Sequence, residues 1–302
     1  MIYPWNERNG RLSWLKLIMF LVVLAPGLWI AAQWWLGWLM PKPVTEAIHQ
    51  SGDWTVRFLV LSLAITPLRK LAHWGKLISV RRMIGVGAAA YASIHLSLYI
   101  LDQNFALGTV ASEIALRFYL TIGFTALCGL WALAATSTDG MIRRLGAKNW
   151  QRLHNIVYGV GVLAMIHFLL QSKIDVTQAV IMTGLFFGLM VWRLLARFDL
   201  AVQWWQMVLL AVGAATFTAL FEAAWYIGRT GRPAVGIGLF ESQFDFDIAI
   251  RPAWYVFFAW LVVAAVSFAR RGEAQKKRPR AAWGAQGPGP SSRSAQEGSR
   301  AL

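Results

Sequence analysis

Three of the five histidines lie in apolar stretches, where an imidazole is unusual. His95 lies in AYASIHLSLY, and His154 and His167 lie near the two ends of WQRLHNIVYGVGVLAMIH. An imidazole can ligate a metal or exchange a proton, and polar groups inside a membrane are costly and commonly mark function. Because Cys128 is the one cysteine, a thiolate cluster cannot form within one chain. Any metal site would therefore rest mainly on histidine.

Membrane helices are the elements that must position these histidines. Hydrophobic residues make up 57% of the 302 residues, charged residues 14%, and the mean hydropathy is +0.50. Roughly 20 apolar residues cross a bilayer core. Eight runs approach or exceed that length, at 17–39, 54–68, 83–101, 114–135, 153–171, 176–195, 205–227 and 253–269. We therefore expect an all-α, polytopic membrane helix bundle.

The lysines and arginines indicate how these helices are oriented. Most of them fall before the first run, in alternate connections and in the tail, which predicts that both termini are cytoplasmic. This distribution explains the net charge of +15 without nucleic acid, which we do not expect as a partner. Residues 1–16 are then a cytoplasmic N-terminus. Residues 271–302, rich in Gly, Pro, Ser and Arg, are predicted to form a basic disordered tail that is attracted to anionic membrane lipids.

His95 and His167 are predicted to lie at one depth. They lie six and four residues before the ends of two runs that cross in the same direction, so both rings are expected roughly 6 to 9 Å inside the outer end. Such a pair matches the axial ligands of a six-coordinate haem iron. Gly85, Ala88 and Ala92 flank His95 at helical spacing. They favour either clearance for a flat ring or close helix packing.

His154 cannot share that site. It precedes His167 by 13 residues, which places it roughly 20 Å away and roughly 140° around an ideal helix, unless Gly159 and Gly161 permit a bend. It could ligate a second, inner haem, hydrogen-bond a cofactor or lie in interfacial water. His49 and His73 fall in predicted polar loops and are expected to be surface residues.

Three stretches together resemble one family. PLRKL, RRMIGVGAAAYASIHLSLY and TSTDGMIRRLGAKNWQRLHNIVYGVGVLAMIH are similar to the MsrQ (YedZ) family within the ferric-reductase-like transmembrane group. The resemblance implies a multi-pass protein of the bacterial inner membrane with a b-type haem, and its histidine pattern falls on His95, His154 and His167. It also implies FMN as a cofactor and electron delivery from the quinone pool to a periplasmic molybdopterin-containing methionine sulfoxide reductase that repairs oxidised proteins.

The resemblance also divides the chain. Residues 17–200 would form the six-span haem-binding core, and residues 201–270 would add two spans beyond it. Two-haem ferric reductases carry a histidine pair on each of two helices, whereas Arg81 and Arg82 occupy the positions 14 and 13 residues before His95. An inner bis-histidine haem is therefore not expected. Glu222, near the outer end of the seventh run, is a weak functional candidate and is better explained as a carboxylate that reaches toward the interface.

Basic residues at the predicted cytoplasmic face would attract a flavin phosphate or an anionic headgroup. They are Arg81, Arg82, Arg143, Arg144, Lys148 and Arg152. Positive-inside topology explains the same residues without a ligand. Two other functions stay open: a stand-alone ferric or quinone reductase, which would turn over without a partner, and a transporter with histidine proton relays. Against the transporter, acidic residues such as Glu46, Glu113, Asp175 and Asp199 lie in loops or at span ends.

Overall fold

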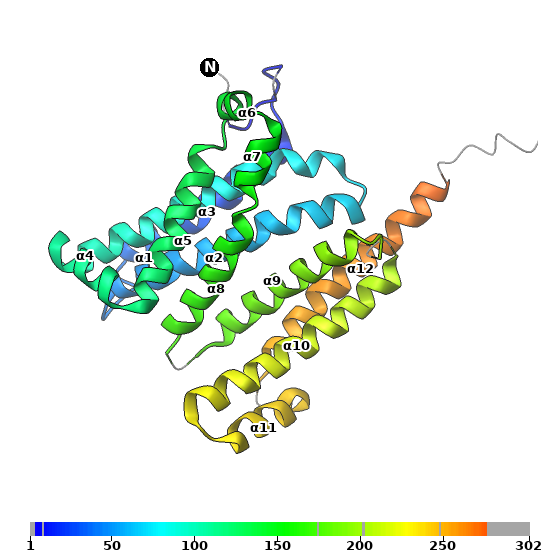
Figure 1. Ribbon diagram of the computed structural model, residues 1–302. Helices are drawn as coiled ribbons and strands as arrows, with labels where there is room; N and C mark the ends of the chain where they lie inside the picture. Colours follow the sequence, from blue (N-terminus) through cyan, green and yellow to red (C-terminus); the bar gives the residue numbers. More distant parts are fainter. Residues whose placement is uncertain (1–3, 8, 174, 201–202, 248, 277–302) are drawn as a thin grey trace, which may run out of the picture.

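The structure is a bundle of helices (Figure 1). The computed structural model describes residues 4–276, except 8, 174, 201–202 and 248. The α-helices are α1 (Trp14–Trp35), α2 (Pro43–Leu71), α3 (Ile78–Asp102), α4 (Leu107–Leu116), α5 (Phe118–Ala135), α6 (Asp139–Leu145), α7 (Ala147–His154), α8 (Val157–Gln171), α9 (Thr177–Ala196), α10 (Trp204–Thr230), α11 (Pro233–Glu241) and α12 (Pro252–Lys276). Two 3₁₀ turns, Gly75–Leu77 and Ser242–Phe244, and one isolated bridge, Asn6–Leu12, complete the regular structure of these residues.

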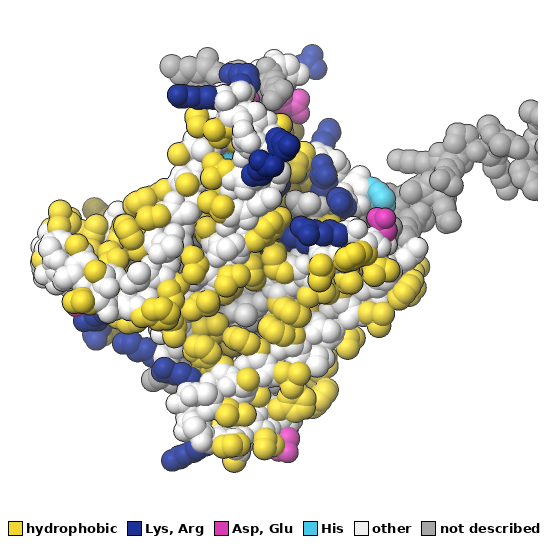
Figure 2. Space-filling view, in the orientation of Figure 1, with side chains coloured by type: hydrophobic (Ala, Val, Ile, Leu, Met, Phe, Trp, Pro, Cys, Tyr) yellow, Lys and Arg dark blue, Asp and Glu magenta, His cyan; other side chains and the backbone are white. Residues whose placement is uncertain are grey.

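Seven helical segments of the described chain are long and apolar enough to cross a membrane. They are Trp14–Trp35, Gly75–Asp102, Phe118–Ala135, Ala147–Gln171, Thr177–Ala196, Trp204–Thr230 and Pro252–Ala269. Apolar side chains cover the flank of the bundle, and Lys and Arg gather over α6 and α7 (Figure 2). Leu28 and Trp35 on α1 are 60% and 89% exposed, which suits contact with lipid rather than water. The predicted all-α membrane bundle is confirmed.

Helix α2 differs from the predicted second span. It contains 29 residues rather than the 15 of the run 54–68, and it is not among the seven segments. Asp53 and Arg57 lower its hydropathy. The helix is nevertheless central, because it packs against α1, α3, α8, α9 and α12 and buries Phe58 and Leu63 at 1% exposure. Neighbouring helices, rather than lipid, surround much of its apolar surface.

Two predicted spans are broken into two helices each. Run 114–135 breaks at Arg117, whose extended backbone separates α4 from α5 and whose side chain pairs with Glu113 at 2.6 Å. Run 153–171 breaks at Asn155–Ile156, between α7 and α8, and not at Gly159 or Gly161, the two positions that were considered for a bend. The basic connection before it, predicted as a loop, is also helical: Thr138 caps α6 by accepting the Met141 N–H at 3.1 Å.

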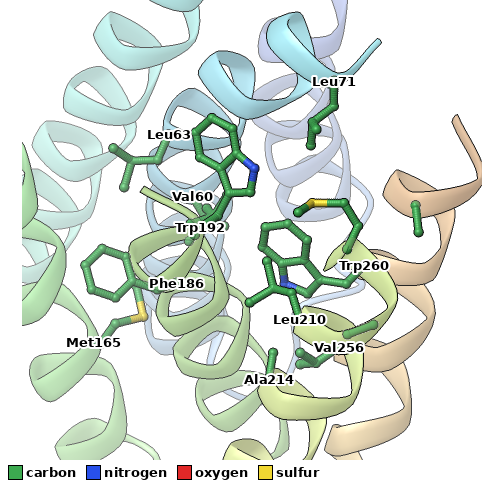
Figure 3. Close-up of a cluster of buried hydrophobic side chains, with 14 of the residues drawn as sticks. Val60, Leu63, Leu71, Met165, Phe186, Trp192, Leu210, Ala214, Val256 and Trp260 are labelled. Atoms are coloured by element: carbon green, nitrogen blue, oxygen red, sulfur yellow. The ribbon is translucent and has the colours of Figure 1, made fainter. Parts of the chain in front are cut away.

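Two buried clusters share α2 and α8. One joins these helices to α3 and α5. The other joins them to α9, α10 and α12, with Trp192 and Trp260 among its largest side chains (Figure 3). An apolar cavity of about 280 Å³ lies where α2, α9 and α12 meet, with Arg57 in its lining. The last two long helices therefore pack directly on the histidine-bearing part of the chain.

Helix α1 contains an internal proline, and Tyr91 of α3 inserts beside it. Pro26 has no N–H to donate, which weakens the helical hydrogen bonding around it. The Tyr91 hydroxyl donates to the Val23 carbonyl at 2.9 Å and accepts the N–H of Gly27 at 2.5 Å. The side chain thus bridges the opened turn and joins α1 to α3.

Substituting Tyr91→Phe is expected to lower the free energy of unfolding by about 1 kcal/mol, because two backbone groups lose a hydrogen-bond partner inside the bundle. Unfolding in mixed detergent micelles, followed by circular dichroism, measures this. Tyr255→Phe, at a side chain that is 49% exposed, is the matched control. Equal stability of the two variants would show that the hydroxyl bridge contributes nothing.

Arg193 has a similar role at the proline of α2. Arg193 lies within α9 and is half-buried. Pro67 cannot donate to the Leu63 carbonyl one turn earlier, and Arg193 Nη2 donates to that carbonyl at 2.6 Å. Its guanidinium also lies 5.5 Å from the centre of the Tyr158 ring. Arg193 therefore joins α9 to α2 and α8.

Helix α12 continues to Lys276, so the predicted tail is wrong for its first six residues. The rest of that prediction, 277–302, lies outside the described residues.

Candidate functional site

His95 of α3 and His167 of α8 lie beside each other. Their ring centroids are 6.3 Å apart, and the two planes are nearly perpendicular at 89°. Both are half-buried, and both lie near the helix ends remote from α6 and α7: Asp102 ends α3, and Gln171 ends α8. The structure thus brings together the two histidines that the sequence placed at one depth.

Each imidazole is held by a backbone carbonyl of a neighbouring helix. His95 Nδ1 lies 2.8 Å from the Ile48 carbonyl oxygen of α2, and His167 Nδ1 lies 2.8 Å from the Tyr119 carbonyl oxygen of α5. A carbonyl can only accept, so both Nδ1 atoms must carry the proton. In a neutral imidazole the Nε2 lone pair is then the one available to a metal.

The spacing of the two rings fits a single metal held between them. Metal–imidazole bonds of about 2 Å through Nε2, on opposite sides of one ion, place the ring centroids about 6 Å apart. The observed separation is 6.3 Å. Among the described residues, no group of three or more His, Cys, Asp or Glu side chains could hold a metal. The donor set is therefore two imidazoles, which suits a metal whose remaining ligands come from a macrocycle such as haem.

The small residues before His95 serve helix packing. A Cβ at Gly85 would lie 3.4 Å from Ser62 Oγ of α2, and Ala88 and Ala92 are buried in the cluster shared with that helix. Of the two explanations considered from the sequence, close packing is the one the structure supports.

His154 ends α7 and has contacts of its own. Its ring stacks on Trp150 with centroids 3.8 Å apart, its Nδ1 lies 3.1 Å from the Trp150 carbonyl oxygen, and its Nε2 lies 3.4 Å from Ser137 Oγ. Trp150 Nε1 donates to the Thr136 carbonyl at 2.9 Å. The stretches TST and WQRLH therefore meet, and Trp150 and His154 fasten α7 to the end of α5.

Lys and Arg side chains gather at the end that includes α6 and α7 (Figure 2), which we call the basic end. The six basic residues predicted to face the cytoplasm lie on α3, α6 and α7. Arg143 and Arg144 lie on α6 and Lys148 and Arg152 on α7, and all four are exposed. Arg81 and Arg82 lie in the first turns of α3, close enough to act electrostatically on His154. Arg82 already pairs with Asp139 at 2.7 Å, so it is less available to an anion than the others.

The two remaining histidines are exposed, as expected. His73 follows α2 with a left-handed backbone, φ 51°. His49 was predicted in a loop but lies within α2, which begins at Pro43.

Glu222 is buried, so the predicted reach toward the interface is wrong. Its side chain is 3% exposed and pairs with Arg251 at 2.7 Å. Gln243 Nε2 lies 3.4 Å from the other carboxylate oxygen, and Trp254 Nε1 donates to the Gln243 carbonyl at 2.6 Å. This polar cluster joins α10 to the connection between α11 and α12. An acidic residue inside an apolar run was the available sequence signal, but its partner lies 29 residues later.

Comparisons with known proteins identify the family. A family model described as the ferric reductase like transmembrane component matches residues 51–165, which include His95 and His154. Relatives named protein-methionine-sulfoxide reductase heme-binding subunit MsrQ occur in Xanthomonas euvesicatoria (40% identical over 185 residues, 59% of this chain and 84% of the relative), Rhodospirillum rubrum (39% over 181, 60% and 85%) and Azospira oryzae (37% over 196, 64% and 84%). No solved structure matches. With identity at this level across more than four fifths of each relative, the chain belongs to the MsrQ family.

Proposed function

We propose that this chain is a haem b electron-transfer subunit of a membrane-bound methionine sulfoxide reductase system, with His95 and His167 as the axial ligands. The supporting observation is the ring pair itself: two imidazoles 6.3 Å apart, each with Nδ1 engaged by a backbone carbonyl. The relatives are named as haem-binding subunits. When bound, a haem supplies reversible one-electron exchange, and its ligands and their hydrogen bonds adjust the potential.

The two ends of the bundle would have different roles in this proposal. By the positive-inside rule, the basic end would lie in the cytoplasm and the histidine pair near the outer face of the bacterial inner membrane. A redox partner in the periplasm would then dock close to the histidines. That partner, by family resemblance, is a molybdopterin-containing methionine sulfoxide reductase that repairs oxidised periplasmic proteins.

The basic end is the proposed entry point for electrons. Its exposed cations, Arg143, Arg144, Lys148 and Arg152, would attract an FMN phosphate or a lipid headgroup, with Arg81 and Arg82 behind them. The quinone pool is the proposed ultimate donor. The family resemblance supports the flavin and quinone assignments, and the charge distribution is compatible with them.

His154 is proposed to be structural rather than an iron ligand. Both of its ring nitrogens lie near protein partners, and the ring stacks on Trp150. Its role would be to hold the α5–α7 junction in place beneath the basic end.

A reduced-minus-oxidised absorption spectrum of the purified protein, expressed with an adequate haem supply, tests the proposal. We expect the α and β bands of a six-coordinate b-type haem, at about one haem per chain. A protein without these bands would exclude the proposed function. Titration with ferric chelates or quinones in the absence of a partner tests the stand-alone reductase, since sustained turnover would favour that alternative.

A further inference from the structure

Both histidines meet the neighbouring helix through the same pair of positions. His95 bonds the carbonyl of Ile48, and Gly52 lies four residues later on α2. His167 bonds the carbonyl of Tyr119, and Gly123 lies four residues later on α5. The two helices are far apart in the sequence, yet each presents a carbonyl at position i and a glycine at position i+4.

Helix geometry explains why that spacing matters. In an α-helix the carbonyl of residue i accepts the N–H of residue i+4, and each Cβ is tilted toward the N-terminus. A side chain at i+4 therefore lies alongside the carbonyl of residue i. Without a Cβ at that position, a ring from another helix can approach the carbonyl from the side and donate a second hydrogen bond to it.

The distances show how little room an added methyl group would have. A Cβ at Gly123 would lie 2.6 Å from both Nδ1 and Cε1 of His167 and 3.0 Å from its Nε2. A Cβ at Gly52 would lie 3.1 Å from Nδ1 and 3.2 Å from Cε1 of His95. The first contact requires the ring to move, whereas a shift of a few tenths of an ångström relieves the second.

Backbone conformation does not account for either glycine. Both lie inside helices without a positive φ, where glycine costs about 1 kcal/mol relative to alanine. Gly159 on α8 provides the contrast, since a Cβ there would meet nothing within 4 Å. The feature that Gly52 and Gly123 share is contact with an imidazole.

We propose that Gly52 and Gly123 are positioning residues that admit the two imidazoles to their carbonyl acceptors and thereby set the tautomer and angle of the haem ligands. This rests on the proposed haem ligation by His95 and His167. In addition, α2 and α5, which supply no ligand themselves, must each carry a glycine four residues after the carbonyl that accepts the imidazole N–H.

The test compares alanine substitutions at these glycines with substitutions at two other helical glycines. Gly123→Ala is expected to weaken haem binding by about 10-fold, as is typical for the partners that orient metal ligands. Gly52→Ala is expected to retain haem but to shift the midpoint potential and the low-spin ferric EPR signal, which reports the angle between the axial rings. Gly129→Ala is the packing control, because a Cβ there would clash with Val160 rather than with a histidine. Gly159→Ala is the neutral control.

The outcomes separate the two proposals. If wild-type protein binds haem and both Gly52→Ala and Gly123→Ala keep its haem content, potential and EPR signal, the positioning role is wrong and the ligand assignment stands. The positioning role is also wrong, and the ligand assignment again stands, if Gly129→Ala shifts the potential and the EPR signal as much as Gly52→Ala and Gly123→Ala do. If wild-type protein lacks a b-type haem, the proposed function itself fails. Should Gly123→Ala not fold, the milder Gly52→Ala decides alone.

Discussion

Replacing either His95 or His167 by alanine is expected to abolish the six-coordinate b-type spectrum. In the proposed assignment the two imidazoles, with centroids 6.3 Å apart, would hold one iron, so each variant would remove one of its two protein ligands and leave the other. We expect haem per chain to fall by more than about 10-fold, since losing a ligand should cost at least as much as losing a partner that orients one. The haem content per chain is measured by the pyridine haemochrome assay, with the protein concentration determined on the same sample.

Two other histidines provide the comparison. His154→Ala is expected to keep the haem-to-protein ratio and to lower the free energy of unfolding by about 1 kcal/mol. It removes the contact with Ser137 Oγ at the end of α5 and the stacking that holds Trp150, whose indole donates to the Thr136 carbonyl. His73→Asn should change neither, since asparagine tolerates the left-handed backbone at that position. A signal that survives in both His95→Ala and His167→Ala would contradict the ligand assignment. A halved haem content in His154→Ala would instead indicate a second haem at that residue.

The common depth of His95 and His167 was predictable because it depends only on helix rise and direction. The atoms that hold the rings were not predictable in this way. Ile48 and Tyr119 contribute backbone carbonyls, which every residue has, so no residue type marks them in the sequence. Gly52 and Gly123 are marked by type, but a glycine in a membrane helix more often reflects close packing, as Gly129 does against Val160.

For the fold, too, features set by the local sequence were predicted, whereas features that depend on contacts with other helices were not. Apolar runs predicted most of the membrane helices, because bilayer thickness sets their length. The breaks at Arg117 and Asn155 were missed since neither interrupts the run with proline. Helix α2 was predicted too short because its polar first part, with Glu46 and Asp53, resembles a connection until the packed neighbours are known.

Arg251→Ala is expected to be among the most destabilising single changes outside the histidine site. Glu222 is 3% exposed, and Arg251 is the cation that compensates its charge, at 2.7 Å. Removing one partner of a buried ion pair typically costs about 3 to 5 kcal/mol, because the other charge is left without compensation. Glu222→Ala should cost less, since the Arg251 side chain is 22% exposed, against 3% for Glu222, and is therefore less desolvated when it is left alone. Unfolding of the purified variants in mixed micelles measures both values.

A double-mutant cycle distinguishes the ion pair from simple packing. Glu222→Leu/Arg251→Leu should be less destabilised than the sum of the two single leucine variants, because neither charge then remains buried alone. The free energy of unfolding of Glu222→Gln, which keeps the side-chain shape and one acceptor oxygen, should lie between those of wild type and Glu222→Ala. If the two leucine substitutions are additive, the pair contributes no coupling energy. The connection between α11 and α12 must then be held by other contacts, such as the Trp254 hydrogen bond to the Gln243 carbonyl at 2.6 Å.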